Sequence, residues 1–74
     1  MNAMERVRCG VIGVGSLGQH HARVYAELPG VELVGVVDTD QKRAEAVASR
    51  HQTRVFPDVR SLAEECEAVS IVVP

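Results

Sequence analysis

The first residues with recognisable chemistry are three closely spaced glycines. Gly13, Gly15 and Gly18 form the pattern G-x-G-x-x-G directly after a short, apolar, β-branched stretch. In this pattern the first glycine permits a tight turn out of a strand, the second lets a diphosphate approach the backbone, and the third lets a helix pack closely on the strand. The backbone N–H groups of Ser16 and Leu17 would then point at the phosphates, where the helix dipole adds positive potential.

An acidic residue follows at the spacing that such a site requires. Asp38 ends the second apolar stretch, 20 positions after Gly18. A carboxylate there accepts hydrogen bonds from the hydroxyls of an adenosine ribose and repels a 2′-phosphate. We therefore expect NAD as the cofactor, with NADP as the weaker candidate. Lys42 and Arg43 follow at the start of a predicted helix, where we expect their side chains to face water.

The elements that must position these residues alternate along the chain. Strands are predicted where short apolar stretches are rich in β-branched residues, at 8–12, 31–37, 54–56 and 68–73. Helices are predicted at 16–28, 41–50 and about 58–66, because apolar residues recur there at helical spacing. The order βαβαβαβ predicts an α/β fold: the first portion of a doubly wound parallel sheet of the Rossmann type.

The first predicted helix has an apolar stripe with one histidine in it. Leu17, His21, Val24, Tyr25 and Leu28 recur at helical spacing. This spacing predicts that the stripe packs against the sheet, with His21 as a core histidine.

The end of the fourth predicted strand has a positional role. In open α/β sheets the ligand lies outside the carboxyl ends of the strands, where the strand order reverses. Val73 and Pro74 stand at that point. We therefore expect them beside the middle of the cofactor.

Composition argues against several other classes of protein. The chain has 8 Lys and Arg, 10 Asp and Glu, and 3% aromatic residues, which is unlike a nucleic-acid binder. No apolar run approaches the roughly 20 residues needed to cross a bilayer. Cys9 and Cys66 are too isolated for a disulfide framework, and we expect no metal site. We expect a cytoplasmic protein.

The sequence resembles the Gfo/Idh/MocA oxidoreductases. The resemblance rests on VRCGVIGVGSLGQHHARVYAELPGVELVGVVD, the helix at 44–48 and the ending AVSIVVP. It implies that the three glycines, Ser16 and Leu17 form a phosphate loop, that Asp38 is the ribose acid, and that Val73 and Pro74 pass the nicotinamide side. It also implies hydride transfer between a hydroxyl carbon of a sugar, polyol or nucleotide sugar and the nicotinamide. HARVYAEL is most similar to family members that act on nucleotide sugars.

The resemblance also implies that part of the machinery lies outside this sequence. The family's E-K-P motif, with its catalytic lysine, and its substrate domain lie downstream of Pro74, so no catalytic residue is matched. We expect residues 1–74 to be the N-terminal part of a dinucleotide-binding domain in a longer, homo-oligomeric protein. A non-catalytic dinucleotide sensor is the alternative, and downstream sequence would distinguish the two. A methyltransferase usually has an acid just before the glycines, where this chain has Val11 and Ile12.

Overall fold

A computed structural model describes residues 6–72 and confirms the predicted order of elements. The strands are β1 (Val7–Ile12), β2 (Val31–Val37), β3 (Arg54–Val55) and β4 (Ala68–Ile71). The helices are α1 (Ser16–Glu27), α2 (Gln41–Arg50) and α3 (Val59–Glu65). The chain therefore has the predicted βαβαβαβ pattern, with third and fourth strands that end earlier than predicted, at Val55 and Ile71.

The four strands form one parallel sheet in the order β3-β2-β1-β4. Ile12, the last residue of β1, pairs with Val37 of β2 on one side and with Ile71 of β4 on the other. The chain leaves β1 towards β2 and β3 and later returns to the opposite side of β1, so the strand order reverses between β1 and β4. This is the Rossmann arrangement, and it places a crevice at the carboxyl end of β1.

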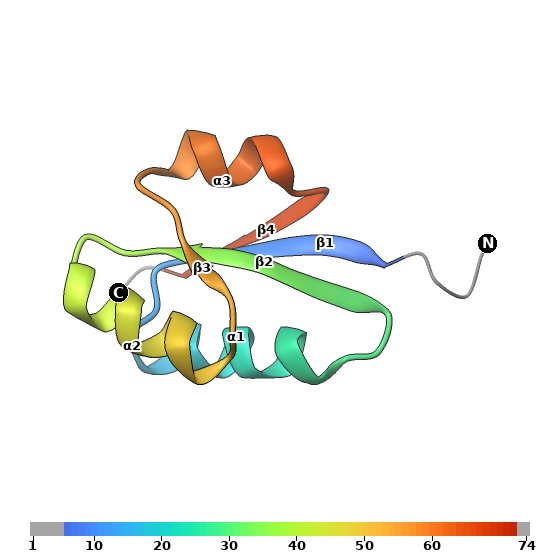
Figure 1. The fold of residues 1–74 in the computed structure, drawn as a ribbon, viewed down its shortest axis with the longest axis horizontal. Coiled ribbons are helices and arrows are strands. Elements are labelled where there is room, and N and C mark those ends of the chain that lie inside the picture. Colours follow the sequence, from blue (N-terminus) through green and yellow to red (C-terminus); the bar gives the residue numbers. More distant parts are fainter. Residues whose placement is uncertain (1–5, 73–74) are drawn as a thin grey trace.

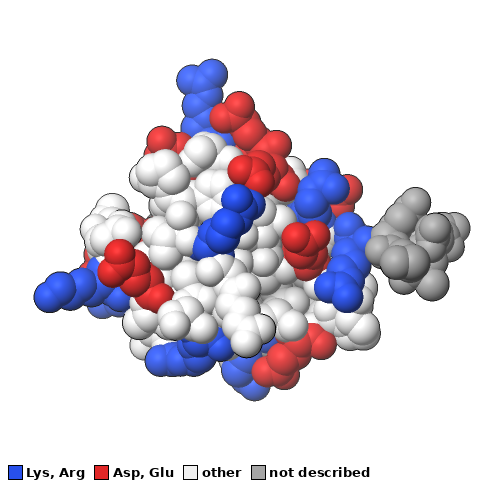
Figure 2. All heavy atoms as spheres, viewed as in Figure 1, with Lys and Arg blue, Asp and Glu red and all other residues white. Residues whose placement is uncertain are grey.

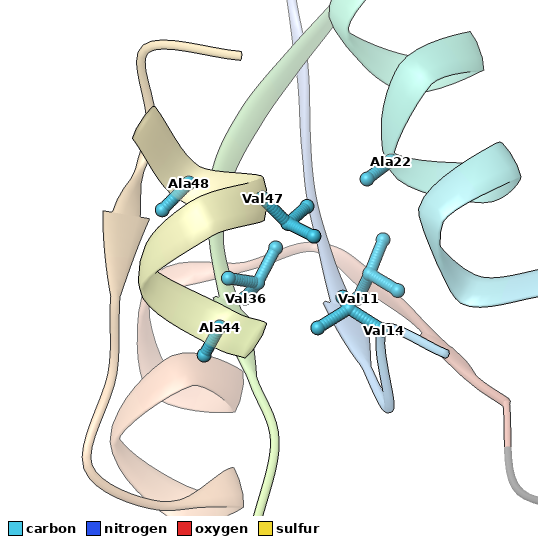
Figure 3. Packing of buried hydrophobic residues seen from close by; sticks show 7 residues of the cluster. All are labelled: Val11, Val14, Ala22, Val36, Ala44, Val47 and Ala48. Carbon is cyan, nitrogen blue, oxygen red and sulfur yellow. The ribbon is translucent and has the colours of Figure 1, made fainter. Parts of the chain in front are cut away.

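Helices cover both faces of the sheet. Helices α1 and α2 lie on one face and α3 lies on the other (Figure 1). Under α1 and α2 the buried residues of the core are valines and alanines (Figure 3): Val11, Val14, Ala22, Val36, Ala44, Val47 and Ala48. Tyr25, Leu33 and Val55 pack against them. On the α3 face, Leu62 is fully buried against Val34 and Phe56. The small side chains in the first core bring α1 and α2 close to the strands.

The buried face of α1 differs from the predicted stripe. Gly18 and Ala22 are its buried residues and Tyr25 packs beside them, whereas Leu17 is 60% exposed. The prediction was right for Tyr25, which packs against the core, and wrong for Leu17, because the first turn of α1 lies so close to the sheet that a glycine fills the space between them. His21 is half-buried rather than a core residue, and its ring meets Tyr25 edge-on, with centroids 6.4 Å apart.

Direct backbone contacts close the turn between β1 and α1. Gly13 has a φ of +87°, and a Cβ added to it would lie 1.9 Å from the carbonyl oxygen of Val72. A Cβ added to Gly18 would lie 1.8 Å from the carbonyl oxygen of Gly13. The end of β1, the first turn of α1 and the residue after β4 therefore touch through main-chain atoms, and no other residue type fits at these two glycines.

Figure 2 shows positive and negative side chains interspersed on this face, with uncharged surface between them. Arg54 pairs with Glu65 at 2.7 Å and lies over the ring of Phe56, 4.7 Å from its centroid. Within residues 6–72, none of the helices has the length and apolar character that a bilayer crossing demands.

The closure at Gly18 predicts an unusual response to alanine. Alanine has the higher helix propensity, by about 1 kcal/mol. We nevertheless expect Gly18→Ala to lower the free energy of unfolding of the complete polypeptide by about 3 kcal/mol, because the new methyl group clashes with a backbone oxygen. Urea unfolding followed by circular dichroism measures this change. The matched control is Gly30→Ala, whose Cβ would meet no atom within 4 Å; its effect should stay below about 1 kcal/mol. Equal losses in the two variants would contradict the packing described for Gly18.

Candidate functional site

A cleft of about 500 Å³ lies at the carboxyl end of β1, where the strand order reverses. Its walls come from the glycine turn, the end of β2, the first turns of α2 and α3, and the residue after β4. They are formed by Ile12, Gly13, Gly15, Ser16, Leu17, Gly18, Val37, Asp38, Thr39, Arg43, Val59 and Val72. Every predicted site residue within 6–72 is therefore at this one cleft. Val73 and Pro74, predicted beside the cofactor, lie outside the described residues.

The N-terminus of α1 opens into the cleft without a capping side chain. The N-cap of α2 is Asp40, whose carboxylate accepts from the Arg43 N–H at 3.1 Å, and that of α3 is Asp58, which accepts from the Ser61 N–H at 2.8 Å. The N-cap of α1 is Gly15, which has no side chain to do this. The first N–H groups of a helix have no partner within it, so those of α1 remain available to an anion.

The face of the turn towards the cleft is bare backbone. A Cβ added to Gly15 would meet only the Arg43 guanidinium, with Nη1 at 3.8 Å, and no backbone atom within 4 Å. Gly15 therefore differs from Gly13 and Gly18, where the fold itself fills the space of a side chain. The free space at Gly15 allows a ligand to reach the amides of Ser16 and Leu17.

The carboxylate of Asp38 is bound to the same turn. Its Oδ1 accepts a hydrogen bond from the Asp40 N–H, and its Oδ2 accepts one from the Val14 N–H, both at 2.8 Å. These two bonds, with that from Asp40 the larger cause, hold the pKa of Asp38 below its ordinary value, so the group is ionised at neutral pH. Each carboxylate oxygen keeps a lone pair for a further donor. Asp38 is thus a fixed acceptor beside the open end of α1.

Two further hydrogen bonds hold the strand ends around the cleft. The Gly13 N–H donates to the carbonyl of Val37 at 2.8 Å, and the Val72 N–H donates to the carbonyl of Ile12 at 2.8 Å. The ladders from β1 to β2 and from β1 to β4 therefore continue into the loops, which these hydrogen bonds hold around the cleft.

Arg43 is a cleft residue that the sequence analysis placed elsewhere. Its side chain lines the cleft, is 47% exposed and reaches within 3.8 Å of the Asp40 carboxylate. Both basic residues are exposed, as expected, but Arg43 also lines the cleft, whereas Lys42 does not. Arg43 is three positions after the N-cap Asp40, in the first turn of α2, and this turn lies at the cleft.

Apolar side chains form the remaining wall. Val59 begins α3 and is 46% exposed, Val37 ends β2, and Val72 follows β4, so that the last two lie on either side of β1. The sequence analysis did not assign these positions to the site. An apolar wall beside hydrogen-bonding groups suits a ligand with both a planar or apolar part and charged groups. In the stretch from 6 to 72, no three His, Cys, Asp or Glu side chains come together as metal ligands.

Comparisons with known proteins agree with this geometry. Residues 7–74 match the Gfo/Idh/MocA family, described as an oxidoreductase family with an NAD-binding Rossmann fold. UDP-N-acetylglucosamine 3-dehydrogenase of Acidithiobacillus ferrooxidans is 48% identical over 71 residues, which is 96% of this chain and 22% of that protein.

Two solved structures contain the bound cofactor. GenD2 from gentamicin A biosynthesis, in complex with NAD, superposes with a TM-score of 0.89 at 29% identity, over 100% of this chain and 22% of that one. The myo-inositol dehydrogenase of Lactobacillus casei, in complex with NAD(H) and myo-inositol, superposes with a TM-score of 0.81 at 36% identity, over 90% of this chain and 21% of that one.

The chain spans about a fifth of the length of these relatives. The match nevertheless covers residues 7–74, which include all seven elements of the fold. The chain belongs to the Gfo/Idh/MocA family of oxidoreductases, through the NAD-binding Rossmann fold of that family.

Proposed function

We propose that residues 1–74 form the N-terminal part of a dinucleotide-binding domain and that the cleft binds NAD. The pyrophosphate would accept hydrogen bonds from the N–H groups of Ser16 and Leu17. The hydroxyls of the adenosine ribose would donate hydrogen bonds to the Asp38 carboxylate. One observation carries this proposal: an uncapped helix N-terminus and an ionised carboxylate, bound to the same turn, face a single cleft.

The three glycines of the turn would have two different roles in this proposal. Gly13 and Gly18 bring β1 and α1 together through main-chain contacts, which places the α1 amides at the strand ends. Gly15 keeps the approach to those amides free. Because the carboxylate accepts from the Val14 N–H, its separation from the phosphate-binding amides is fixed before a ligand arrives. A preorganised site of this kind loses little entropy on binding.

We further propose that the whole protein transfers hydride between the nicotinamide and a hydroxyl-bearing carbon of a sugar, polyol or nucleotide sugar. The activities of the relatives support this class, and the 48% identity to a UDP-N-acetylglucosamine 3-dehydrogenase favours a nucleotide sugar. The family match favours an oxidoreductase over a non-catalytic sensor. The residues of this chain would bind and orient the cofactor, which supplies the redox chemistry when bound. The acid–base residues and the oligomer contacts would come from the remainder of the polypeptide.

A serine at position 15 tests the open helix end. Serine is a favourable N-cap, so we expect Gly15→Ser to leave the free energy of unfolding unchanged or to raise it by up to about 1 kcal/mol. The same hydroxyl would accept a hydrogen bond from an N–H group of α1 and would fill space that the pyrophosphate needs. NAD affinity should therefore fall by about tenfold or more. Calorimetric titration of the complete polypeptide measures the affinity, and urea unfolding measures the stability. Undiminished affinity for NAD would exclude this end of α1 as the phosphate site.

A matched pair of charge-neutralising variants tests the ribose acid. We expect Asp38→Asn to weaken NAD binding by about tenfold, because two hydroxyls lose a charged acceptor. Asp40→Asn removes the same charge two positions away and keeps an N-cap side chain, so it should change the affinity less than about threefold. Fluorescence titration with NADH measures both variants. If the larger loss occurs in Asp40→Asn, then Asp38 is not the ribose acid.

The hydrogen bonds of Asp38 also predict a dependence of stability on pH. Its pKa is lowered from the ordinary value of 3.8, so its contribution to stability is complete above that value and is lost as the pH falls through the lower, folded-state pKa. The stability difference between the unmodified protein and Asp38→Asn should therefore be constant from about pH 8 to pH 5 and shrink towards about pH 3. Urea unfolding across this range measures the difference. A difference that grew with acidity would contradict the assigned bonds.

A further inference from the structure

One apolar side of α1 remains outside the core. Leu17, His21, Val24 and Leu28 recur at helical spacing along α1 and its C-cap, and we call these four residues the α1 stripe. Leu17 is 60% exposed and Leu28 44%, whereas His21 and Val24 are half-buried. Because the sheet meets α1 along its glycine and alanine side, residues 6–72 leave the α1 stripe only partly covered.

Two hydrogen bonds show which way the α1 stripe faces. Gln19 lies on the side of α1 that faces α2, because its Oε1 accepts a hydrogen bond from Arg50 Nη1 at 3.3 Å. Tyr25 lies on the side that faces β4, because its hydroxyl is hydrogen-bonded to the hydroxyl of Ser70. With 3.6 residues per turn, the α1 stripe lies beside Tyr25 and opposite Gln19. It therefore borders the region beside β4, away from α2.

The handedness of the fold leaves this region open. From β1 to β3 the chain crosses the sheet with α1 and α2 on one face, and it returns to the far side of β1 with α3 on the other face (Figure 1). Crossovers between parallel strands are right-handed, so a strand added outside β4 would bring its connecting helix to the α3 face.

Such a connecting helix would not cover the α1 face of β4. Ser70 lies on that face, and Ala68 shares it because side chains alternate along a strand. Ala68 is exposed and Ser70 is half-buried. A longer sheet therefore needs a helix of another kind to cover this face and the α1 stripe.

We propose that the α1 stripe and the adjoining face of β4 form a docking surface for an amphipathic helix from the polypeptide beyond residue 74, one that does not connect two strands of the sheet. The inference rests on the proposed function, because it takes residues 1–74 to be the first part of a longer protein. The relatives leave room for such a helix, since the chain spans 22% of the UDP-N-acetylglucosamine 3-dehydrogenase and 21% of the myo-inositol dehydrogenase. A helix satisfies its own backbone groups, so it can cover a sheet face without pairing with a strand edge.

The narrow shape of the α1 stripe favours a segment of the same polypeptide over a second copy. On the solvent side the stripe is bordered by His20, Arg23 and Glu27. Arg23 is hydrogen-bonded to His20 at 3.0 Å and paired with Glu27 at 3.9 Å. Stable interfaces between separate proteins use about 20–30 residues on each side, far more than this stripe provides. A tethered helix avoids much of the entropy cost of bringing two molecules together, so a small apolar surface is enough to hold it.

Thiol labelling in the complete polypeptide tests whether the α1 stripe is covered. Leu28→Cys places a thiol in the stripe, and Ala26→Cys is the matched control on another side of α1; both positions are exposed within residues 6–72. We expect iodoacetamide to label Leu28→Cys about tenfold more slowly than Ala26→Cys, because only transient opening would expose it. Mass spectrometry of the peptide that carries each position measures the rates. Equal rates would overturn the proposal.

Photo-crosslinking identifies what covers the stripe. Benzoylphenylalanine is incorporated at position 28 of the complete polypeptide, and chains with natural and heavy nitrogen are refolded together before illumination. We expect crosslinks of uniform isotopic composition to residues beyond 74 that recur every three or four positions, as on one side of a helix. Crosslinks of mixed composition assign the surface to a second copy, and crosslinks at every second position assign it to a strand; either result overturns the proposal.

NAD titration separates this inference from the proposed function. Neither Leu28 nor Ala26 lines the cleft, so both cysteine variants should bind NAD as the unmodified protein does. If NAD binds and Leu28→Cys is labelled as fast as Ala26→Cys, this inference alone fails. If the unmodified protein binds no dinucleotide, the proposed function fails whatever the labelling rates are.

Discussion

The structure depends on main-chain atoms that touch where side chains would ordinarily stand. The carbonyl oxygens of Val72 and Gly13 occupy the positions that side chains at Gly13 and Gly18 would need. This contact brings the first turn of α1 against the ends of β1 and β4. The backbone amides of the first turn of α1 therefore lie where the strand order reverses. The short distance between α1 and the sheet is also the reason why the core between them contains valine and alanine side chains.

Asp38 contributes both to the fold and to the candidate site. Its carboxylate accepts from the Val14 N–H, so the end of β2 is fastened to the glycine turn at the position where a ribose would be held. One ionised group thereby stabilises the loop and presents an acceptor to the cleft. Arg43 extends this arrangement from the first turn of α2. A carboxylate and a guanidinium, two side chains of opposite charge, therefore both line the cleft.

The order of the elements and six of the cleft residues could be predicted from the sequence, because glycine spacing and a strand-ending acid constrain the backbone directly. The buried face of α1 could not be predicted, because periodicity shows where apolar residues recur but not how close the helix lies to the sheet. Leu17 fits the apolar stripe and is exposed, whereas Gly18 is buried. Arg43 and Val59 were missed for a related reason. Their place in the cleft depends on where the first turns of α2 and α3 end in space.

A crystal structure of the complete polypeptide with NAD would test the central claim most directly. The account predicts pyrophosphate oxygens within about 3.2 Å of the amide nitrogens of Ser16 and Leu17, and ribose hydroxyls at a similar distance from the Asp38 carboxylate. It also predicts that the Val14 N–H keeps its bond to Asp38. A dinucleotide bound away from the glycine turn, or a ribose that makes no contact with Asp38, would contradict the account.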